Sequence, residues 1–213
     1  MEDICVIIPA RYKSKRLPGK PLIKIHDKEL LLLTYEKAKK TFNSKDIYIF
    51  TDSKKVLDKL KEKIPNIFLF KKNFKNGTER ASYGLQYLKK KYKAALLISC
   101  DNPFITTISI KTCIKAYKLI KKDNDYFGST IHTVNKKESV FNNKNIAKIV
   151  INQKNDVMYI SRSPIPYNYK IIKNFRTHHG PVCIKLKNLK TYSDSSNTPL
   201  QIAEDNEWLK IME

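Results

Sequence analysis

Short apolar runs alternate with amphipathic stripes through the first 122 residues, and this alternation constrains the fold more than any other feature. The apolar runs are predicted as strands, and the stripes, where apolar residues recur every three or four positions, as helices. The strands are expected at residues 3–10, 46–53, 66–72 and 94–101, and the helices at 30–42, 54–64, 80–92 and 108–122. This rhythm favours a mainly parallel α/β sheet with helices on both faces.

The pattern changes after about residue 126. Strand candidates now follow one another with only short loops between them, at residues 125–134, 145–153, 156–163 and 180–187. The middle two are separated by a hairpin turn. Thr198 and Pro199 are expected to start a last helix, 198–213. With no internal repeat or low-complexity linker, we expect one domain, 1–213, whose second half is mixed or antiparallel.

Composition favours a globular protein without a membrane partner. Hydrophobic residues make up 41% of the chain, yet no run reaches the roughly 18 apolar residues of a membrane span. Acidic residues precede a short apolar run that breaks at Pro9, which is unlike a signal peptide, so a cytoplasmic location is expected. The cysteines lack the spacing of a zinc or disulfide framework and are predicted to be buried reduced thiols, at Cys5, Cys100, Cys113 and Cys183.

A net charge of +22 would ordinarily suggest a nucleic-acid partner. However, the lysines are spread along the whole sequence, whereas nucleic-acid readers tend to concentrate arginine forks in one patch. We therefore expect no nucleic-acid partner. Most cationic residues of this chain are lysines, so we expect the few arginines to mark positions that need a guanidinium group. These are Arg11, Arg16, Arg80, Arg162 and Arg176.

Polar residues gather where three of the predicted strands end. The first strand runs into a basic loop, "NGTER" (76–80) follows the third, and Asp101 ends the fourth. The carboxyl ends of parallel strands lie at one edge of a sheet, which is where such sheets bind ligands. These three stretches therefore predict a site at that edge.

The basic loop has neither a G-x-G-x-x-G pattern nor a P-loop, so side chains rather than glycines would bind phosphate. Ser14 can donate a hydrogen bond and Gly19 permits a tight turn, and the loop's cations suit a polyphosphate: Arg11, Lys13, Lys15, Arg16 and Lys20. A solvated basic loop is the alternative. Asp101 is well placed to hold Mg²⁺ beside such a ligand. Thr78 either contacts a ligand or caps the following helix.

These stretches resemble motifs of the CMP-Kdo synthetases, the 3-deoxy-manno-octulosonate cytidylyltransferases. "IPARYKSKRLPGKPL" matches every fixed position of I-P-A-R-x-x-S-x-R-L-P-G-K-P-L. "NGTER" is similar to S-G-T-E-R, and "SCDNPFI" stands where the family has Q-G-D-E-P. Later stretches resemble F-S-R-x-P-I-P, R-H-I-G-x-Y-A-Y and S-P-L-E-x-x-E-x-L-E-Q-L-R. The matches occur in order and cover nearly the whole chain.

The resemblance implies a Rossmann-like nucleotidyltransferase (glycosyltransferase-A-like) fold, a homodimer, and Mg²⁺ as cofactor. The implied reaction transfers CMP from CTP to the anomeric hydroxyl of Kdo, an acidic sugar, and serves lipopolysaccharide synthesis. By position, Arg11, Lys20 and Asp101 would be catalytic, with Asp101 on the metal. The nucleotide would be held by Arg11, Ser14, Arg16, Lys20, Thr78 and Arg80, and the sugar by Arg162, His178 and Glu207. Residues 125–190 would form the sugar-binding and dimerisation portion.

The chain also departs from the family pattern. Ser99-Cys100 replaces Gln-Gly, Asn102 replaces Glu, and Trp208 replaces Gln. Trp208 either narrows the sugar pocket or packs in the core, and packing is favoured. The family places a second metal-binding Asp on a later strand, and residues 190–213 offer no replacement, because Asp205 and Glu207 are expected on a helix.

Several interpretations therefore stay open. The sequence is shortened, or the metal site uses one protein carboxylate, or activity is lost. The protein is accordingly a Kdo cytidylyltransferase, a cytidylyltransferase for another acidic sugar such as an amino-Kdo or a nonulosonate, or a non-catalytic relative that binds nucleotide or RNA.

Overall fold

The computed structural model describes residues 3–13, 17–167 and 174–213. Its contacts divide the chain into two compact units. Unit 1 comprises Met1–Thr130 and Pro181–Asp194, and unit 2 comprises Ile131–Gly180 and Ser195–Glu213. The portion predicted to be strand-rich, 125–190, contributes to both units. Its strands Gly128–Thr130 and Val182–Lys185 belong to unit 1, whereas Ile131–Gly180 belongs to unit 2.

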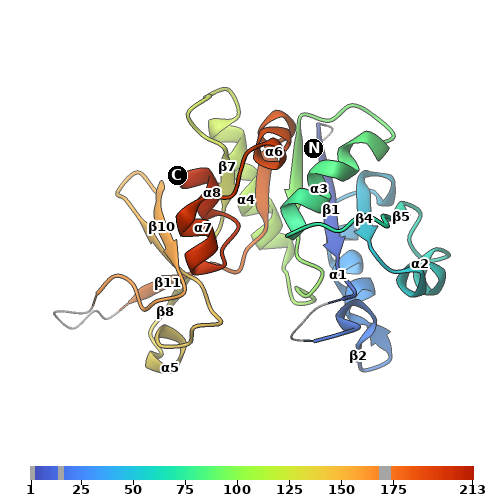
Figure 1. The fold of residues 1–213 in the computed structure, drawn as a ribbon, viewed down its shortest axis with the longest axis horizontal. Coiled ribbons are helices and arrows are strands. Elements are labelled where there is room, and N and C mark those ends of the chain that lie inside the picture. The colour runs from blue at the N-terminus through green and yellow to red at the C-terminus, as the bar shows by residue number, and fades with distance from the viewer. Residues whose placement is uncertain (1–2, 14–16, 168–173) are drawn as a thin grey trace. The chain divides into compact units, whose positions relative to one another are not determined.

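Unit 1 is built on a six-stranded sheet with the order β5-β4-β1-β6-β12-β7 (Figure 1). The first four strands in this order are parallel, and β12 runs antiparallel to both of its neighbours. The strands are β1 (Ile4–Ala10), β4 (Ile47–Thr51), β5 (Ile67–Leu69), β6 (Ala94–Leu97), β7 (Gly128–Thr130) and β12 (Val182–Lys185). The predicted mainly parallel α/β sheet is confirmed.

Continuous burial along the central strands means that both faces of this sheet are covered. Every residue of β4 and β6 is buried, and so is every residue of β1 except Pro9. A strand buried on two faces must be apolar at each position, which is why these runs lack polar alternation. Helix α1 packs with α4, and α3 packs with α6. The helices are α1 (Leu30–Lys39), α2 (Lys54–Leu60), α3 (Gly77–Tyr83), α4 (Thr107–Ile120) and α6 (Leu186–Asp194).

Two features of unit 1 differ from the sequence prediction. The helix expected at 80–92 stops early: α3 gives way to a 3₁₀ turn, η3 (Gly84–Tyr87), and then to extended chain. Here Gly84 lies against the ring of Phe50, and a Cβ at this position would come within 2.1 Å of a ring carbon. Helix α6 was not predicted. Two further 3₁₀ turns and a two-stranded ribbon complete the unit: η1 (Lys20–Leu22), η2 (Ser44–Asp46), β2 (Lys24–Ile25) and β3 (Lys28–Glu29).

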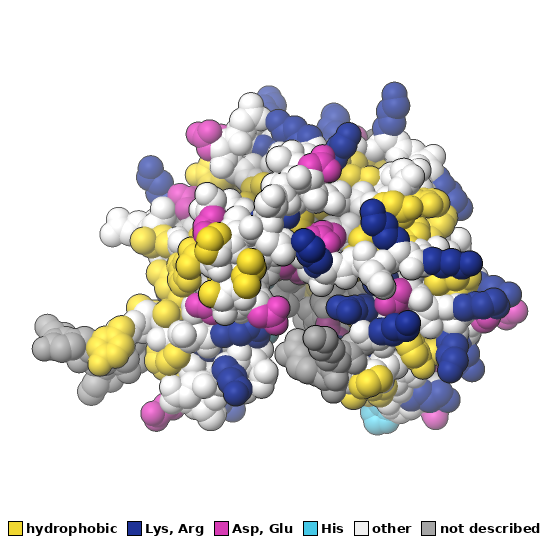
Figure 2. All heavy atoms as spheres, viewed as in Figure 1, with side chains coloured by type: hydrophobic (Ala, Val, Ile, Leu, Met, Phe, Trp, Pro, Cys, Tyr) yellow, Lys and Arg dark blue, Asp and Glu magenta, His cyan; other side chains and the backbone are white. Residues whose placement is uncertain are grey.

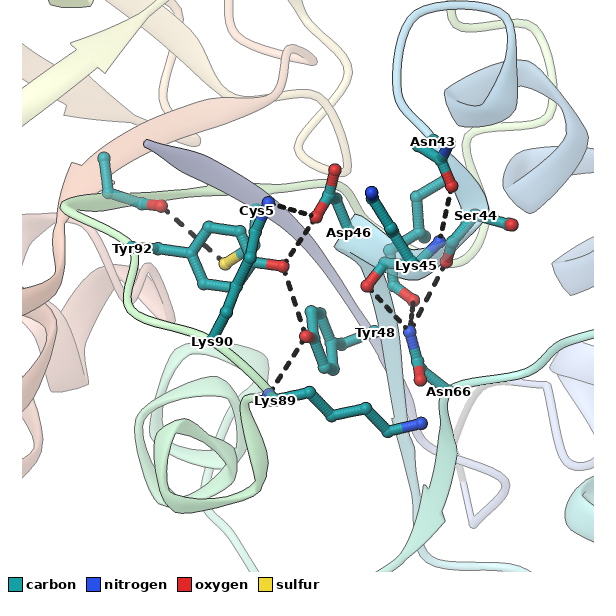
Figure 3. Close-up of polar contacts among 12 residues, drawn as sticks. Cys5, Asn43, Ser44, Lys45, Asp46, Tyr48, Asn66, Lys89, Lys90 and Tyr92 are labelled. Atoms are coloured by element: carbon teal, nitrogen blue, oxygen red, sulfur yellow. Dashed lines mark hydrogen bonds and ion pairs between the residues drawn. The ribbon is translucent and has the colours of Figure 1, made fainter. Parts of the chain in front are cut away.

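A polar network fastens the amino ends of β4 and β6 (Figure 3). The Tyr92 hydroxyl lies 2.8 Å from Asp46 Oδ1 and 3.2 Å from the Tyr48 hydroxyl. The amide of Lys89 donates to the Tyr48 hydroxyl, and the ammonium of Lys90 lies 2.8 Å from Asp46. Tyr48 and Tyr92 are buried. Since the buried hydroxyls are hydrogen-bonded, this cluster serves to hold the two segments together.

Unit 2 contains an antiparallel sheet with the order β10-β9-β11-β8. The predicted hairpin joins β9 to β10, with Asn155 in its turn at a φ of 66°. Strand β11 was not predicted. Ile149, Ile160 and Leu209 form the core of the unit, and Trp208 packs against them, as the packing alternative proposed. The elements are β8 (Thr133–Asn135), α5 (Glu138–Phe141), β9 (Lys148–Ile151), β10 (Val157–Ser161), β11 (Phe175–Thr177), α7 (Pro199–Glu204) and α8 (Leu209–Met212).

The prediction of a single helix over 198–213 is wrong. Helix α7 begins after Thr198, as predicted, but ends at Asp205, which adopts a left-handed conformation with a φ of 45°. The amide of Asn206 then donates to the carbonyl of Gln201, which closes the end of the helix. Glu207 lies in the turn before α8, so neither Asp205 nor Glu207 is on a helix.

All four cysteines are buried, as predicted. Lysine and arginine side chains are dispersed over the face drawn in Figure 2, with acidic side chains between them. This agrees with the spread of lysines along the whole sequence. The longest described helix, α4, has 14 residues, and no helix in the described ranges is long and apolar enough to cross a membrane.

Candidate active site

The three stretches singled out in the sequence follow β1, β5 and β6. After β1 the chain builds β4 and β5 on one side of it and then returns to place β6 on the other side. In open α/β sheets, ligands usually bind at such a reversal of strand order, outside the carboxyl ends of the strands. The loops after β1 and β6 therefore flank the expected position of a ligand.

The basic loop after β1 folds back on itself. The amide of Gly19 donates to the carbonyl of Tyr12 over 3.0 Å, and Gly19 has a φ of 73°, so the tight turn predicted here is present. Arg11 is exposed and Lys20 is half-buried at the start of η1. Ser14 and Arg16, both predicted to bind nucleotide, lie outside the described residues.

Lys20 forms an ion pair with Asp101, in the turn that follows β6. The Ser99 hydroxyl donates to the other carboxylate oxygen of Asp101. Partial burial opposes ionisation of Asp101, but the hydrogen bonds from Lys20 and Ser99 and the charge of Lys20 outweigh it and lower its pKa. Asp101 thus carries a full negative charge at neutral pH, and 36% of its side chain is exposed. Two predicted catalytic residues from loops far apart in the sequence are therefore in contact.

Arg80 lies on α3 and is almost completely buried, with 3% of its side chain exposed. Its Nη2 lies 3.3 Å from Asp52 Oδ2, and its guanidinium carbon lies 5.4 Å from the centre of the Phe74 ring. Burial lowers the pKa of Arg80, although the charge of Asp52 opposes this. No described residue accepts a hydrogen bond from Nη1. Because an unsatisfied buried donor costs about 1–3 kcal/mol, this nitrogen is suited to a ligand oxygen.

Asp52, the partner of Arg80, was missed by sequence reasoning. It directly follows β4, and its Oδ1 accepts a hydrogen bond from the amide of Tyr12 over 2.7 Å. The signal that could have found it is the polar end of the predicted strand 46–53, since that strand is parallel to β1 and ends at the same edge.

Thr78 is buried in the first turn of α3. The helix is capped instead by Asn76, whose side-chain oxygen accepts from the amide of Glu79 over 2.9 Å. The alternative that Thr78 is the N-cap is therefore wrong. The side-chain amide of Asn76 also donates to the Tyr192 hydroxyl over 2.9 Å, which fixes the start of α3 against α6.

Cys100 departs from the family pattern and immediately precedes Asp101. Its side chain is buried and its carbonyl accepts from the Thr34 hydroxyl over 3.1 Å. Burial raises the pKa of the thiol to about 12, so the nucleophilic thiolate does not form at neutral pH. Cys100 is thus a structural neighbour of Asp101.

The residues predicted to bind sugar all lie in unit 2. The backbone amide of Arg162 donates to the Glu204 carboxylate over 2.8 Å. Its guanidinium donates to three backbone carbonyls, those of Lys144, Glu204 and Asp205. The fully buried Lys148 donates to the Arg162 carbonyl. Most of these hydrogen bonds of Arg162 therefore go to Glu204 and Asp205, and they anchor the end of α7.

His178 and Glu207 are the other two residues predicted to bind sugar. The ring of His178 lies 6.4 Å from that of Trp208, nearly perpendicular to it, and Glu207 immediately precedes Trp208. Burial, together with the neighbouring His179, lowers the pKa of His178 to about 4, so this imidazole is neutral at physiological pH. A neutral imidazole can donate and accept hydrogen bonds with a polyhydroxyl ligand.

Asp101 offers a metal ion a partly exposed carboxylate at the nucleotide side of the site. Among the residues that the structure describes, no group of three or more His, Cys, Asp or Glu side chains is arranged to hold a metal. Mg²⁺ bound to nucleotides is commonly held by one or two carboxylates together with phosphates and water, so a partly exposed Asp101 fits that role.

A sequence profile of the cytidylyltransferase family matches residues 5–211 of the chain. The chain belongs to the cytidylyltransferase family. It is 34% identical to 3-deoxy-manno-octulosonate cytidylyltransferase of Wigglesworthia glossinidia brevipalpis, over 90% of this chain and 79% of the relative. It is 32% identical to the mitochondrial 3-deoxy-manno-octulosonate cytidylyltransferase of Arabidopsis thaliana, over 97% of this chain and 71% of the relative.

The solved structure of CMP:2-keto-3-deoxy-manno-octonic acid synthetase complexed with CTP has the same fold. It superposes with a TM-score of 0.86 at 25% identity and covers 98% of this chain and 85% of its own. The family match spans both units, so this cytidylyltransferase carries its nucleotide-side and sugar-side candidates within one matched region. The family is one of nucleotidyltransferase enzymes.

Proposed function

We propose that the protein transfers CMP from CTP to the anomeric hydroxyl of Kdo, with release of pyrophosphate. The observation that carries this proposal is the Lys20–Asp101 pair at the switch point of the sheet, in a chain related over nearly its full length to named Kdo cytidylyltransferases. A cation and a carboxylate that meet at this edge suit a metal-bound triphosphate.

In the proposed reaction, the sugar hydroxyl attacks the α-phosphorus of CTP. A new oxygen–phosphorus bond forms as the bond to the β-phosphate breaks. Pyrophosphate departs with the electrons of that bond, and the hydroxyl proton passes to solvent. Arg11 and Lys20, together with Ser14 and Arg16, would bind the triphosphate and offset the charge that develops on it. Arg80, whose buried Nη1 donates to no residue within the described ranges, and Thr78 would bind the cytidine.

Asp101 would hold Mg²⁺ against the triphosphate, and the ion would supply positive charge there. On the sugar side, His178 and Glu207 would contact the acidic sugar, and Arg162 would act largely through the end of α7 that it anchors. We propose further that the enzyme is a cytoplasmic homodimer and that its product enters lipopolysaccharide synthesis.

The deciding experiment measures pyrophosphate release from CTP with this 213-residue chain, with and without Kdo, and in Mg²⁺ or in EDTA. Kdo-dependent and Mg²⁺-dependent release is expected. An amino-Kdo and a nonulosonate serve as matched acidic sugars, and UTP replaces CTP as the nucleotide control. Release with another sugar but not with Kdo would reassign the substrate. CTP binding without release under any condition would favour a non-catalytic relative.

A further inference from the structure

Asp52 joins two separate parts of the nucleotide site. It lies at the end of β4, and both of its carboxylate oxygens are used: one accepts from the Tyr12 amide over 2.7 Å and the other from Arg80 over 3.3 Å. Its side chain is 13% exposed and that of Arg80 is 3% exposed. Little solvent therefore competes for this contact, and the hydrogen bonds are charge-assisted.

The Tyr12 peptide is held from both sides. The Tyr12 amide donates a hydrogen bond to Asp52, and the Tyr12 carbonyl accepts one from the Gly19 amide over 3.0 Å. Arg11 immediately precedes this residue and Lys20 immediately follows Gly19. The Asp52 contact therefore helps to fix the position from which Arg11 and Lys20 extend.

A carboxylate beside a triphosphate site is unfavourable unless its charge is used within the protein, because it would repel the ligand. The charge of Asp52 is balanced by the buried guanidinium of Arg80, whose Nη1 donates to none of the described residues. This arrangement suits a residue that orients other groups and does not itself contact an anion.

We propose that Asp52 is a positioning residue of the nucleotide site, which aligns Arg80 and the loop bearing Arg11 and Lys20 for CTP. This inference rests on the proposed function and adds a residue to it. It predicts that removal of the carboxylate weakens CTP binding, even though it also removes a negative charge from the surroundings of an anionic ligand.

The test compares CTP affinity, by calorimetric titration, in the wild-type protein, Asp52→Asn and Asp58→Asn. Asp58 is a matched control: it is an exposed carboxylate on α2, 2.6 Å from Lys54, and its substitution changes the charge equally. Asp52→Asn should weaken CTP binding and lower kcat/KM for CTP by about 10- to 100-fold, because small misplacements of binding groups cost this much. The KM for the sugar should change little, and Asp58→Asn should resemble the wild type.

A double-mutant cycle separates positioning from stability. Arg80→Met removes the buried cation, so the double variant Asp52→Asn/Arg80→Met leaves no unpaired charge at these two positions and stays testable if Asp52→Asn alone folds poorly. In the Arg80→Met background, Asp52→Asn should weaken CTP binding several-fold less than in the wild type. The unfolding temperatures of the same four proteins show whether affinity changes without loss of folding.

Wild-type or tighter CTP binding by Asp52→Asn, or equal effects in both backgrounds, would overturn the inference. Failure of the proposed reaction is distinguishable, because it would appear in the wild-type protein as an absence of sugar-dependent pyrophosphate release, whereas the inference fails in the comparison of variants.

Discussion

At the scale of single residues, Lys20 and Asp101 neutralise one another across 81 positions of the sequence. The side chains are 28% and 36% exposed, so both are accessible to a ligand. In the proposed reaction the two residues have different partners, the triphosphate for Lys20 and the metal for Asp101. Their substitutions should therefore have different effects.

We expect Lys20→Ala to weaken CTP binding by about 10-fold, because a charge-assisted contact with phosphate is lost. Asp101→Asn should abolish Mg²⁺-dependent turnover yet bind CTP in EDTA at least as well as the wild type, since a negative charge is removed. Calorimetry and pyrophosphate release measure the two effects. Lys24→Ala, at an exposed position of β2, is the control. Unchanged turnover in Asp101→Asn would remove this residue from the site.

At the scale of secondary-structure elements, the network of Figure 3 makes the stability of unit 1 depend on pH. Partial burial opposes ionisation of Asp46, but hydrogen bonds from Lys90 and Tyr92 outweigh it and lower the pKa of this carboxyl. A lowered folded-state pKa stabilises the fold above the unfolded value of about 3.9, and this contribution is lost as the pH falls through the folded-state value.

Asp46→Asn should therefore lower the free energy of unfolding at pH 7 by about 1 kcal/mol and flatten its decline below about pH 4. Urea unfolding between pH 7 and pH 3 measures both effects. Asp27→Asn, at an exposed position between β2 and β3, provides the comparison. If the two variants showed the same slope below pH 4, the network would not be the source of the pH dependence.

At the scale of the whole molecule, a net charge of +22 on 213 residues implies strong self-repulsion in the compact state. Salt screens this repulsion, because the Debye length falls from about 30 Å at 0.01 M to about 8 Å at 0.15 M. We expect the unfolding temperature to rise, and CTP affinity to fall, as NaCl is increased over this range. Sucrose, which carries no charge, should not weaken CTP binding. An unfolding temperature that falls with salt would contradict the repulsion argument.

Much of the fold could be predicted because its signals are local. The strands β1, β4 and β6 read as continuous apolar runs since both of their faces are buried, and the βα rhythm then predicts a parallel sheet. The basic loop and Asp101 were recognised because each follows such a run. The functional roles assigned to these residues are predictions, whereas the contact between Lys20 and Asp101 is a property of the structure.

The sequence by itself determined the fold class, because apolar periodicity is encoded within a few neighbouring positions. The strand ends and the resemblance to the family supplied the candidate site residues, whose roles stay predictions. Only the tertiary structure shows that Gly84, which follows the last residue of α3, packs against the ring of Phe50. It also decided the break at Asp205 and the role of Asp52, whose partners lie on other elements. Contacts between residues distant in sequence leave no periodic signal along the chain, and only the folded arrangement reveals them.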